Sequence, residues 1–290
     1  MLAKFRINHP FLYAIVVYAV FTVVFNLVGW LYSNVFSGLL SASDAMDEAM
    51  SSLIGEIAAA AALCFVLYRT GKLGLLTKKG KGFFGGLAVG GFCLGCIVMY
   101  ALRSFAGEDG SDPLAVNFTA TSLVYVLSMM MVGVAEELEA RALIAETFLE
   151  HFGTAREAAL KAALISGFFF GIMHITNLAS QSVSETLPQV VLCVTSGILY
   201  GAIYFRSGNL WSIVVIHGLN DVAASLSTWL FAGGAEAASE AASEAASFSM
   251  VSLVPILLIG ALDIAVALFL LRKSKAAEIE ENWPEIAAVK

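Results

Sequence analysis

The sequence predicts an all-α polytopic membrane protein with about eight transmembrane helices, and its composition is the first reason. Of its 290 residues 59% are hydrophobic and only 13% are charged, and the mean hydropathy is +0.84. Soluble domains are about 45–50% apolar and about 25% charged. The composition therefore excludes an ordinary soluble domain, and no basic patch with interleaved aromatic residues indicates nucleic-acid binding.

The second reason is the number of long apolar runs, since a transmembrane helix needs about 20 mostly apolar residues. The first run is much longer than the core of a signal peptide and no small-residue cleavage site follows it, so we expect a retained signal anchor. The second run is short if it ends at Arg69, whereas the fourth is long enough to tilt or to project into the cytoplasm. The candidate spans are residues 11–36, 53–69, 83–102, 117–149, 158–179, 187–205, 210–231 and 250–271.

The third reason is the distribution of positive charge between the spans. With a cytoplasmic N-terminus, the segments on the cytoplasmic side hold all but two of the 16 Lys and Arg residues. The exceptions are Arg103, in an outer segment, and Arg141, within the fourth span. This asymmetry follows the positive-inside rule and predicts that both termini are cytoplasmic.

Glycine and cysteine within the spans are expected to pack rather than to react. Gly86 with Gly90, and Gly91 with Gly95, have the spacing that lets helices approach closely, and we favour internal packing over dimerisation. All four cysteines lie in apolar segments. The C-x-x-C at 93–96 has no His or second cysteine pair nearby, so these thiols are expected to be small packing residues.

Four segments organise the chain around these spans. Residues 1–116 hold the first three spans, and residues 117–231 form a core of spans four to seven. Residues 232–249 form an extracytoplasmic loop that repeats E-A-A-S three times. We expect a spacer there, with a short helix on the outer membrane surface as the alternative. Residues 250–290 hold the last span and a cytoplasmic tail, which we expect to be frayed.

Ionisable and polar side chains inside three predicted spans are the exception to the apolar pattern. A charge near the bilayer centre costs at least about 2.5–3.5 kcal/mol on insertion scales, so such groups persist where they pair or act. They are Glu136, Glu137, Glu139 and Arg141 in the fourth span, His174 in the fifth, and His217, Asn220 and Asp221 in the seventh.

Helical spacing separates the acids of the fourth span. Glu137 and Arg141 are four residues apart in the favoured acid-before-base order, so they can neutralise each other. Glu136 is turned by about 100° from Glu137. We therefore expect Glu136 to remain free and to face His174 and a water.

Depth in the membrane decides whether the three spans can share one site. At about 1.5 Å per residue, the inner ends of the spans lie about 15 Å from Glu136, about 20 Å from His174, about 12 Å from His217 and about 18 Å from Asp221. His217 and Asp221 also share a helix face. In a bilayer core about 30 Å thick, we expect one common cavity in or near the inner half.

The residue types of this cavity favour hydrolysis by an activated water. A carboxylate and an imidazole can hold and deprotonate a water, and a second histidine with an Asn or Asp can stabilise an oxyanion. G-x-S-x-G and H-E-x-x-H do not occur, so serine-hydrolase and zincin sites are not indicated. Zinc bound by Glu136, His174 and His217 is chemically possible, but a site without metal or cofactor is favoured. From the residues alone, catalysis and transport both remain open.

The three groups of residues resemble the motifs of the CAAX protease and bacteriocin-processing family, which includes the type II CAAX prenyl endopeptidases. That family carries E-E-x-x-x-R, F-x-x-x-H and H-x-x-x-N or H-x-x-x-D on separate helices in this order. Here the motifs read Glu136-Glu137-LEA-Arg141, Phe170-GIM-His174 and His217-GLN-Asp221. The resemblance covers about residues 117–231.

The resemblance implies an intramembrane glutamate endopeptidase that acts near the cytoplasmic half of a cell membrane, in a bacterium. Glu136 and His174 would activate the attacking water, and His217 and Asp221 would bind the substrate carbonyl or its oxyanion. Supporting roles fall to Glu137, Arg141, Asn220 and Phe170. The partner would be a CAAX-like, bacteriocin-like or pheromone-like peptide, or a membrane-protein substrate.

Departures from the family pattern keep other functions open. Glu139 adds a third acid in the middle of the first motif, and it is expected either to influence the ionisation of its neighbours or to face the cavity. Asp221, in place of Asn, donates a hydrogen bond only when protonated, and Asn220 can share that role. The alternatives are a non-catalytic scaffold or self-immunity protein and an ion-coupled transporter, although no internal repeat supports transport.

Overall fold

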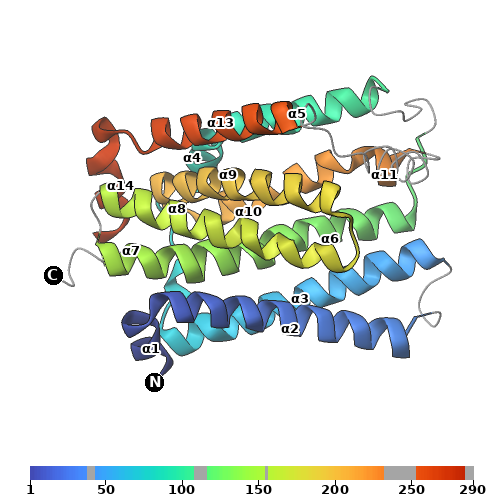
Figure 1. Cartoon of the computed structure of the whole chain (residues 1–290), viewed down its shortest axis with the longest axis horizontal. Coiled ribbons are helices and arrows are strands. Elements are labelled where there is room, and N and C mark those ends of the chain that lie inside the picture. The colour runs from blue at the N-terminus through green and yellow to red at the C-terminus, as the bar shows by residue number, and fades with distance from the viewer. Residues whose placement is uncertain (38–42, 108–115, 154–155, 232–252, 285–290) are drawn as a thin grey trace.

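The computed structural model describes residues 1–37, 43–107, 116–153, 156–231 and 253–284 (Figure 1). Every regular element within these ranges is a helix, which confirms the predicted all-α fold. The E-A-A-S repeat, predicted to be an outer spacer, lies outside the described residues. The described helices are α1 (Leu2–Asn8), α2 (Pro10–Val35), α3 (Asp44–Thr70), η1 (Leu73–Thr77), α4 (Phe83–Val89), α5 (Gly91–Phe105), α6 (Ala120–Glu137), η2 (Leu138–Ala145), α7 (Glu146–Phe152), α8 (Arg156–Met173), η3 (His174–Ala179), α9 (Val183–Ser207), α10 (Leu210–Ala224), α11 (Leu226–Leu230), α13 (Leu253–Leu270), η5 (Lys273–Lys275) and α14 (Ala276–Asn282).

Long apolar helices make this a multi-pass membrane protein. Within the described chain, six helical segments are long and apolar enough to cross a membrane. They are Pro10–Val35, Asp44–Thr70, Ala120–Phe152, Arg156–Ala179, Val183–Ser207 and Leu253–Leu270. The number is smaller than the predicted eight, because two of the predicted spans differ from a continuous long helix.

The third predicted span is broken at Gly90, where α4 and α5 meet at an angle of 74°. A Cβ at Gly90 would lie 2.2 Å from Ile216, and one at Gly86 would lie 2.1 Å from the Ser212 hydroxyl. These two glycines therefore let the segment lie close against α10. The expected internal packing is confirmed for this glycine pair, whereas Gly95 has open space around it.

The seventh predicted span is a helix of only 15 residues, α10, which is followed by the short α11. At about 1.5 Å per residue α10 is about 22 Å long, too short to cross the bilayer core alone. It ends where the Ser225 hydroxyl donates a hydrogen bond of 2.6 Å to the Asp221 carbonyl. The apolar pattern continues beyond this point, so it did not reveal the break.

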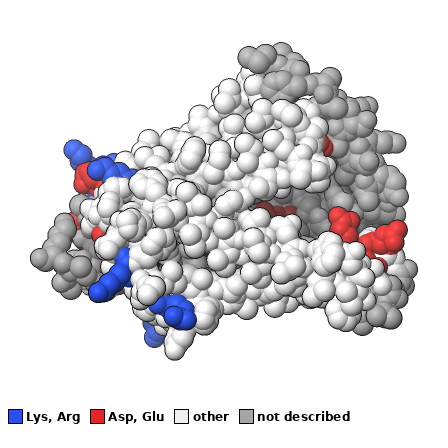
Figure 2. Space-filling view, turned by 60° about the horizontal axis from the view of Figure 1, so that its bottom comes forward, with Lys and Arg blue, Asp and Glu red and all other residues white. Residues whose placement is uncertain are grey.

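Charge is segregated between the two ends of the bundle. Both termini lie at one end, with α1, α7 and α14 (Figure 1). Lys and Arg gather at this end, whereas Asp and Glu gather at the other (Figure 2). At the basic end the buried Glu146 accepts from Arg6 at 2.8 Å and from Lys72 at 2.6 Å, and both bases also pair with Glu150. These ion pairs connect α1 and the turn between α3 and η1 to α7.

The chain end is docked rather than frayed over residues 276–284. Trp283 is fully buried and donates from its indole nitrogen to the Phe205 carbonyl at 3.1 Å. Glu278 pairs with Lys81, Arg206 and Lys275. Hydrogen bonds from these three cations hold the pKa of Glu278 well below its usual range. The expected frayed tail is therefore wrong for this segment, because a single aromatic side chain anchors it.

Candidate active site

The first motif lies where a long helical segment changes its winding. α6 continues into η2, a π-helical segment, and then into α7. Every residue of η2 is buried, and η2 contacts α2, α3, α8 and α9. Inserted π turns often occur at functional sites. Glu136 is half-buried just before this segment, whereas Glu137, Glu139 and Arg141 are fully buried.

A close crossing of α6 and α10 brings the first and third motifs together. A Cβ at Gly133 would lie 2.7 Å from the backbone nitrogen of Gly218 and 2.8 Å from the carbonyl oxygen of Val214. Backbone atoms cannot move aside as a flexible side chain can, so only glycine fits at position 133. The crossing places His217 against two acids that precede it by about 80 positions in the chain.

Glu137 connects Arg141 to His217. Its Oε2 lies 2.9 Å from Arg141 Nε, but the two groups are not aligned as a hydrogen bond, so this contact is a buried ion pair. Its Oε1 lies 2.8 Å from His217 Nδ1 and accepts a hydrogen bond from it. The predicted pairing of Glu137 with Arg141 is confirmed. The same carboxylate also orients His217, which the sequence did not indicate.

Two aromatic rings surround the Arg141 guanidinium. Its central carbon lies 4.9 Å from the centroid of Phe170 and 5.6 Å from that of Tyr200. Within the described residues, neither Nη atom makes a hydrogen bond. Cation–π contacts of this kind stabilise a desolvated guanidinium by about 2 kcal/mol. The Tyr200 ring also lies 5.2 Å from the His217 ring, tilted by 49° to it. Tyr200 is a neighbour of the site that the sequence does not predict.

The free edge of His217 faces two carboxylates. Its Nε2 lies 3.6 Å from Glu136 and 3.4 Å from Asp221. Glu136 was expected to face His174, but no hydrogen bond or ion pair joins these two residues in the described chain. Glu136 instead lies next to the imidazole of His217. Spacing within one helix does not predict how closely α6 and α10 cross.

His174 begins η3, directly after α8, and is held in one tautomer by the preceding turn. Its Nδ1 lies 2.9 Å from the Phe170 carbonyl oxygen. A carbonyl only accepts, so Nδ1 carries the proton and Nε2 of the neutral ring is an acceptor. The Phe170 ring lies 5.3 Å from the His174 ring and 5.6 Å from the His217 ring. Phe170 therefore separates the two imidazoles.

A cavity of about 940 Å³ unites the three motifs. Motif residues in its wall are Glu136, Phe170, His174, His217, Asn220 and Asp221. Glu137, Glu139 and Arg141 are not among the lining residues. The expectation that Glu139 faces the cavity is wrong, because it is fully buried in η2, and neither of its oxygens makes a hydrogen bond with described residues.

One acid in the cavity wall, Glu56 of α3, is missing from the residues predicted from the sequence. It interacts electrostatically with Glu136, His217 and Asp221. An acid followed by a run of alanines within an apolar helix was the signal that could have identified it.

The cavity extends toward the acidic end of the bundle. Its wall includes the turn 179–181 between η3 and α9, and Ser225 after α10, at the end opposite the termini (Figure 1). None of the described lining residues comes from α1, η1, α7 or α14. Figure 2 shows a hollow with acidic side chains inside it. The sequence predicts a site in or near the half next to the termini, whereas this cavity wall extends to the opposite end of the bundle.

His174 lies further from the start of α8 than the sequence predicts. This residue follows an 18-residue helix, which at about 1.5 Å per residue puts it about 27 Å from the start of α8. The predicted depth of His174 depends on an inner boundary at Lys161, whereas α8 begins at Arg156.

No group of three His, Cys, Asp or Glu side chains in the described chain is arranged to hold a metal ion. His217 uses Nδ1 to contact Glu137, and His174 uses Nδ1 to contact a carbonyl. Each histidine therefore has only Nε2 available toward the cavity.

Comparison with known proteins identifies the region that holds these residues. No curated protein and no solved structure matches this chain. Residues 118–223, little more than a third of the chain, match the family model described as "Type II CAAX prenyl endopeptidase Rce1-like". The matched range contains all three motifs and ends two residues after Asp221. The predicted resemblance is thereby confirmed for residues 118–223, which are similar to the Rce1-like type II CAAX prenyl endopeptidases.

Proposed function

We propose that this protein is an intramembrane glutamate endopeptidase that cleaves a peptide bond with an activated water and without a metal ion. The observation that carries the proposal is the shared cavity, in which side chains of α6, η3 and α10 meet inside a membrane protein. The family match supports a protease in general. The roles of individual residues are part of the proposal.

Water activation is assigned to Glu136 and His174. Nε2 of His174 is an acceptor in the neutral ring, and Glu136 is the only acid of the first motif in the cavity wall that the structure describes. Together they remove a proton from the water while its oxygen bonds to the peptide carbonyl carbon. The same proton then moves to the departing amine nitrogen as the C–N bond breaks.

Oxyanion stabilisation is assigned to His217 and Asn220. Since His217 donates Nδ1–H to Glu137, its imidazolium form presents Nε2–H to the cavity. The Asn220 amide adds a second donor from the same helix. Asp221, 3.4 Å from Nε2, stabilises the charge on that ring. Glu137 and Arg141 act as positioning residues, because they lie outside the cavity wall.

The substrate is proposed to be a CAAX-like, bacteriocin-like or pheromone-like peptide. The chain is proposed to lie in a bacterial cell membrane with both termini in the cytoplasm. In this orientation the substrate enters the cavity from the acidic, outer end. Cysteine labelling with a membrane-impermeant reagent at Ser180→Cys tests this: labelling of intact cells is expected, and protection in intact cells would reverse the orientation.

Peptide profiles of whole cells test the activity without requiring that the substrate be identified first. Cells that produce the wild type, Glu136→Gln or a control, Glu157→Gln, are compared for small membrane-associated peptides. The Glu157 side chain is 65% exposed and far from the cavity wall. A product should vanish only in Glu136→Gln. If cells with Glu136→Gln keep every product and phenotype that deletion removes, the protein acts as a scaffold.

A further inference from the structure

The cavity wall contains an acid that the proposed hydrolysis does not use. Glu56 is only 4% exposed, and it lies in α3, outside the matched residues 118–223. It lines the same cavity as Glu136 and Asp221 and interacts electrostatically with both. A carboxyl group at this position is close enough to the reacting groups to contact a bound substrate.

Glu56 is held on a rigid part of the wall. A Cβ at the preceding Gly55 would lie 2.9 Å from a ring carbon of Phe25 and 3.1 Å from its carbonyl oxygen. α3 is therefore pressed against α2 at this point and cannot move closer to it. Side chains on packed helices keep their geometry better than those on loops, which favours specific contact with a ligand.

The bonding capacity of Glu56 is not satisfied by the protein. Its Oε2 is buried and makes no hydrogen bond with any described residue. A buried carboxylate is costly unless a cation or a donor compensates it. None of the described residues that line the cavity is Lys or Arg. Arg141 is not in the cavity wall and is already paired with Glu137. His217 already contacts three other carboxylates. A cationic group of a bound substrate could therefore pair with Glu56.

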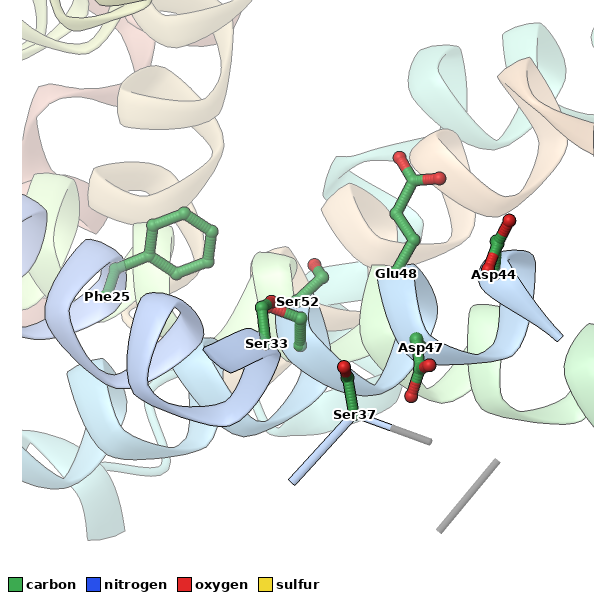
Figure 3. A pocket seen from close by; sticks show the side chains of 8 residues that line it. Phe25, Ser33, Ser37, Asp44, Asp47, Glu48 and Ser52 are labelled. Carbon is green, nitrogen blue, oxygen red and sulfur yellow. The ribbon is translucent and has the colours of Figure 1, made fainter. Parts of the chain in front are cut away.

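A second acidic surface leads from the end of the bundle to Glu56. A neighbouring pocket of about 480 Å³ shares Phe25 and Ser52 with the main cavity, and Ser52 is one helical turn before Glu56. Its other walls include acidic residues at the start of α3, seen in Figure 3: Asp44, Asp47 and Glu48. Clefts lined by one sign of charge concentrate ligands of the opposite sign.

We propose that Glu56 is a specificity-determining residue that binds a cationic group of the substrate peptide, a Lys or Arg side chain close to the scissile bond. The proposal rests on the proposed peptidase function and narrows its substrates to peptides that place a basic residue beside an apolar segment. Glu56 forms the ion pair, while Glu136 and His174 perform the hydrolysis.

Paired peptides separate this role from a merely structural one. The probes are membrane-soluble fluorogenic peptides with an apolar core, in which Lys or its uncharged analogue norleucine is placed at each position in turn. Full-length wild type in liposomes is expected to cleave the Lys peptide at least about tenfold faster at one position, since loss of one partner of a buried charge pair has effects of this size or more. Glu56→Gln, which keeps the shape of the side chain, should lower this ratio to below about threefold, because cleavage of the Lys peptide falls more than cleavage of the norleucine peptide.

Glu157→Gln is the matched control, because it removes the same charge from an exposed position that lines neither pocket. It should keep the preference for Lys. An unchanged Lys-to-norleucine ratio in Glu56→Gln would overturn the proposal, as would equal loss of cleavage of both peptides.

Binding gives a readout that does not need cleavage. The same peptides are titrated against wild type, Glu56→Gln and Glu136→Gln by fluorescence anisotropy. Tighter binding of the Lys peptide is expected for wild type and Glu136→Gln and is expected to disappear in Glu56→Gln. Equal binding of both peptides by the wild type would overturn the inference. Full cleavage by Glu136→Gln would instead overturn the proposed hydrolysis, so the two failures are distinguishable.

Discussion

Replacing Gly133 by alanine tests whether the α6–α10 crossing sets the geometry of the site. The added Cβ would lie 2.7 Å from the nitrogen of Gly218 and 2.8 Å from the oxygen of Val214. Ordinary Cβ contacts begin at 3.4 Å. The two helices therefore have to separate by about 0.7 Å, the difference between 3.4 and 2.7 Å, and misplacement of about 1 Å can lower a rate by about 100-fold.

Overpacking of this kind also destabilises a protein by about 1–3 kcal/mol. We therefore expect Gly133→Ala to lower kcat by about 10- to 100-fold. The free energy of unfolding should fall by about 1–3 kcal/mol. The assays are peptide cleavage in liposomes and denaturant unfolding in detergent.

Gly95→Ala is the matched control. Gly95 lies in another membrane helix, and a Cβ there has open space. Alanine is favoured over glycine in a helix by about 0.8–1.0 kcal/mol, so this variant should be as active as the wild type and no less stable. Wild-type kcat and stability in Gly133→Ala would refute the reasoning, because they would show that the crossing can open without consequence.

Two further predictions concern buried or paired charges, and a third concerns metal dependence. Glu137→Gln should lower the free energy of unfolding by about 3–5 kcal/mol and abolish cleavage, because it leaves Arg141 as an uncompensated buried charge. A stability and a cleavage rate equal to those of the exposed variant Glu157→Gln would contradict this. Hydrogen exchange of α14 should be faster in Glu278→Gln than in the wild type above about pH 4.3, the ordinary glutamate pKa. Since the pKa of Glu278 is lowered in the folded state, the difference should shrink as the pH falls below that value; a difference that grows in acid would show that the cations do not stabilise this carboxylate. Cleavage should survive 1,10-phenanthroline and EDTA, whereas loss of activity that added zinc restores would replace the metal-free mechanism.

Local sequence patterns predicted the helices and the residue pairs within one helix. Glu137 and Arg141 are four residues apart, and helical spacing alone brings them to 2.9 Å. The common cavity followed from depth, because three helices with polar groups at compatible depths can meet.

Contacts between helices did not follow from the sequence. The hydrogen bond from His217 to Glu137 depends on a crossing at Gly133 and Gly218, which no periodicity reveals. The close approach of Gly90 to Ile216 likewise joins residues far apart in the sequence. Glu56 was missed because a single acid in an apolar helix gains meaning only from its neighbours in other helices.

The cleavage rate of purified Glu136→Gln relative to wild type, measured on one peptide in liposomes, tests the central claim most directly. Glu136 lines the cavity, whereas its neighbour Glu137 does not, so this substitution removes the acid proposed to activate water without touching the buried ion pair. General acid–base catalysis contributes about 10²–10⁴-fold, and we predict a loss in this range with unchanged peptide binding. A rate within about threefold of wild type would be a smaller loss than the removal of a general base causes, and it would contradict the account.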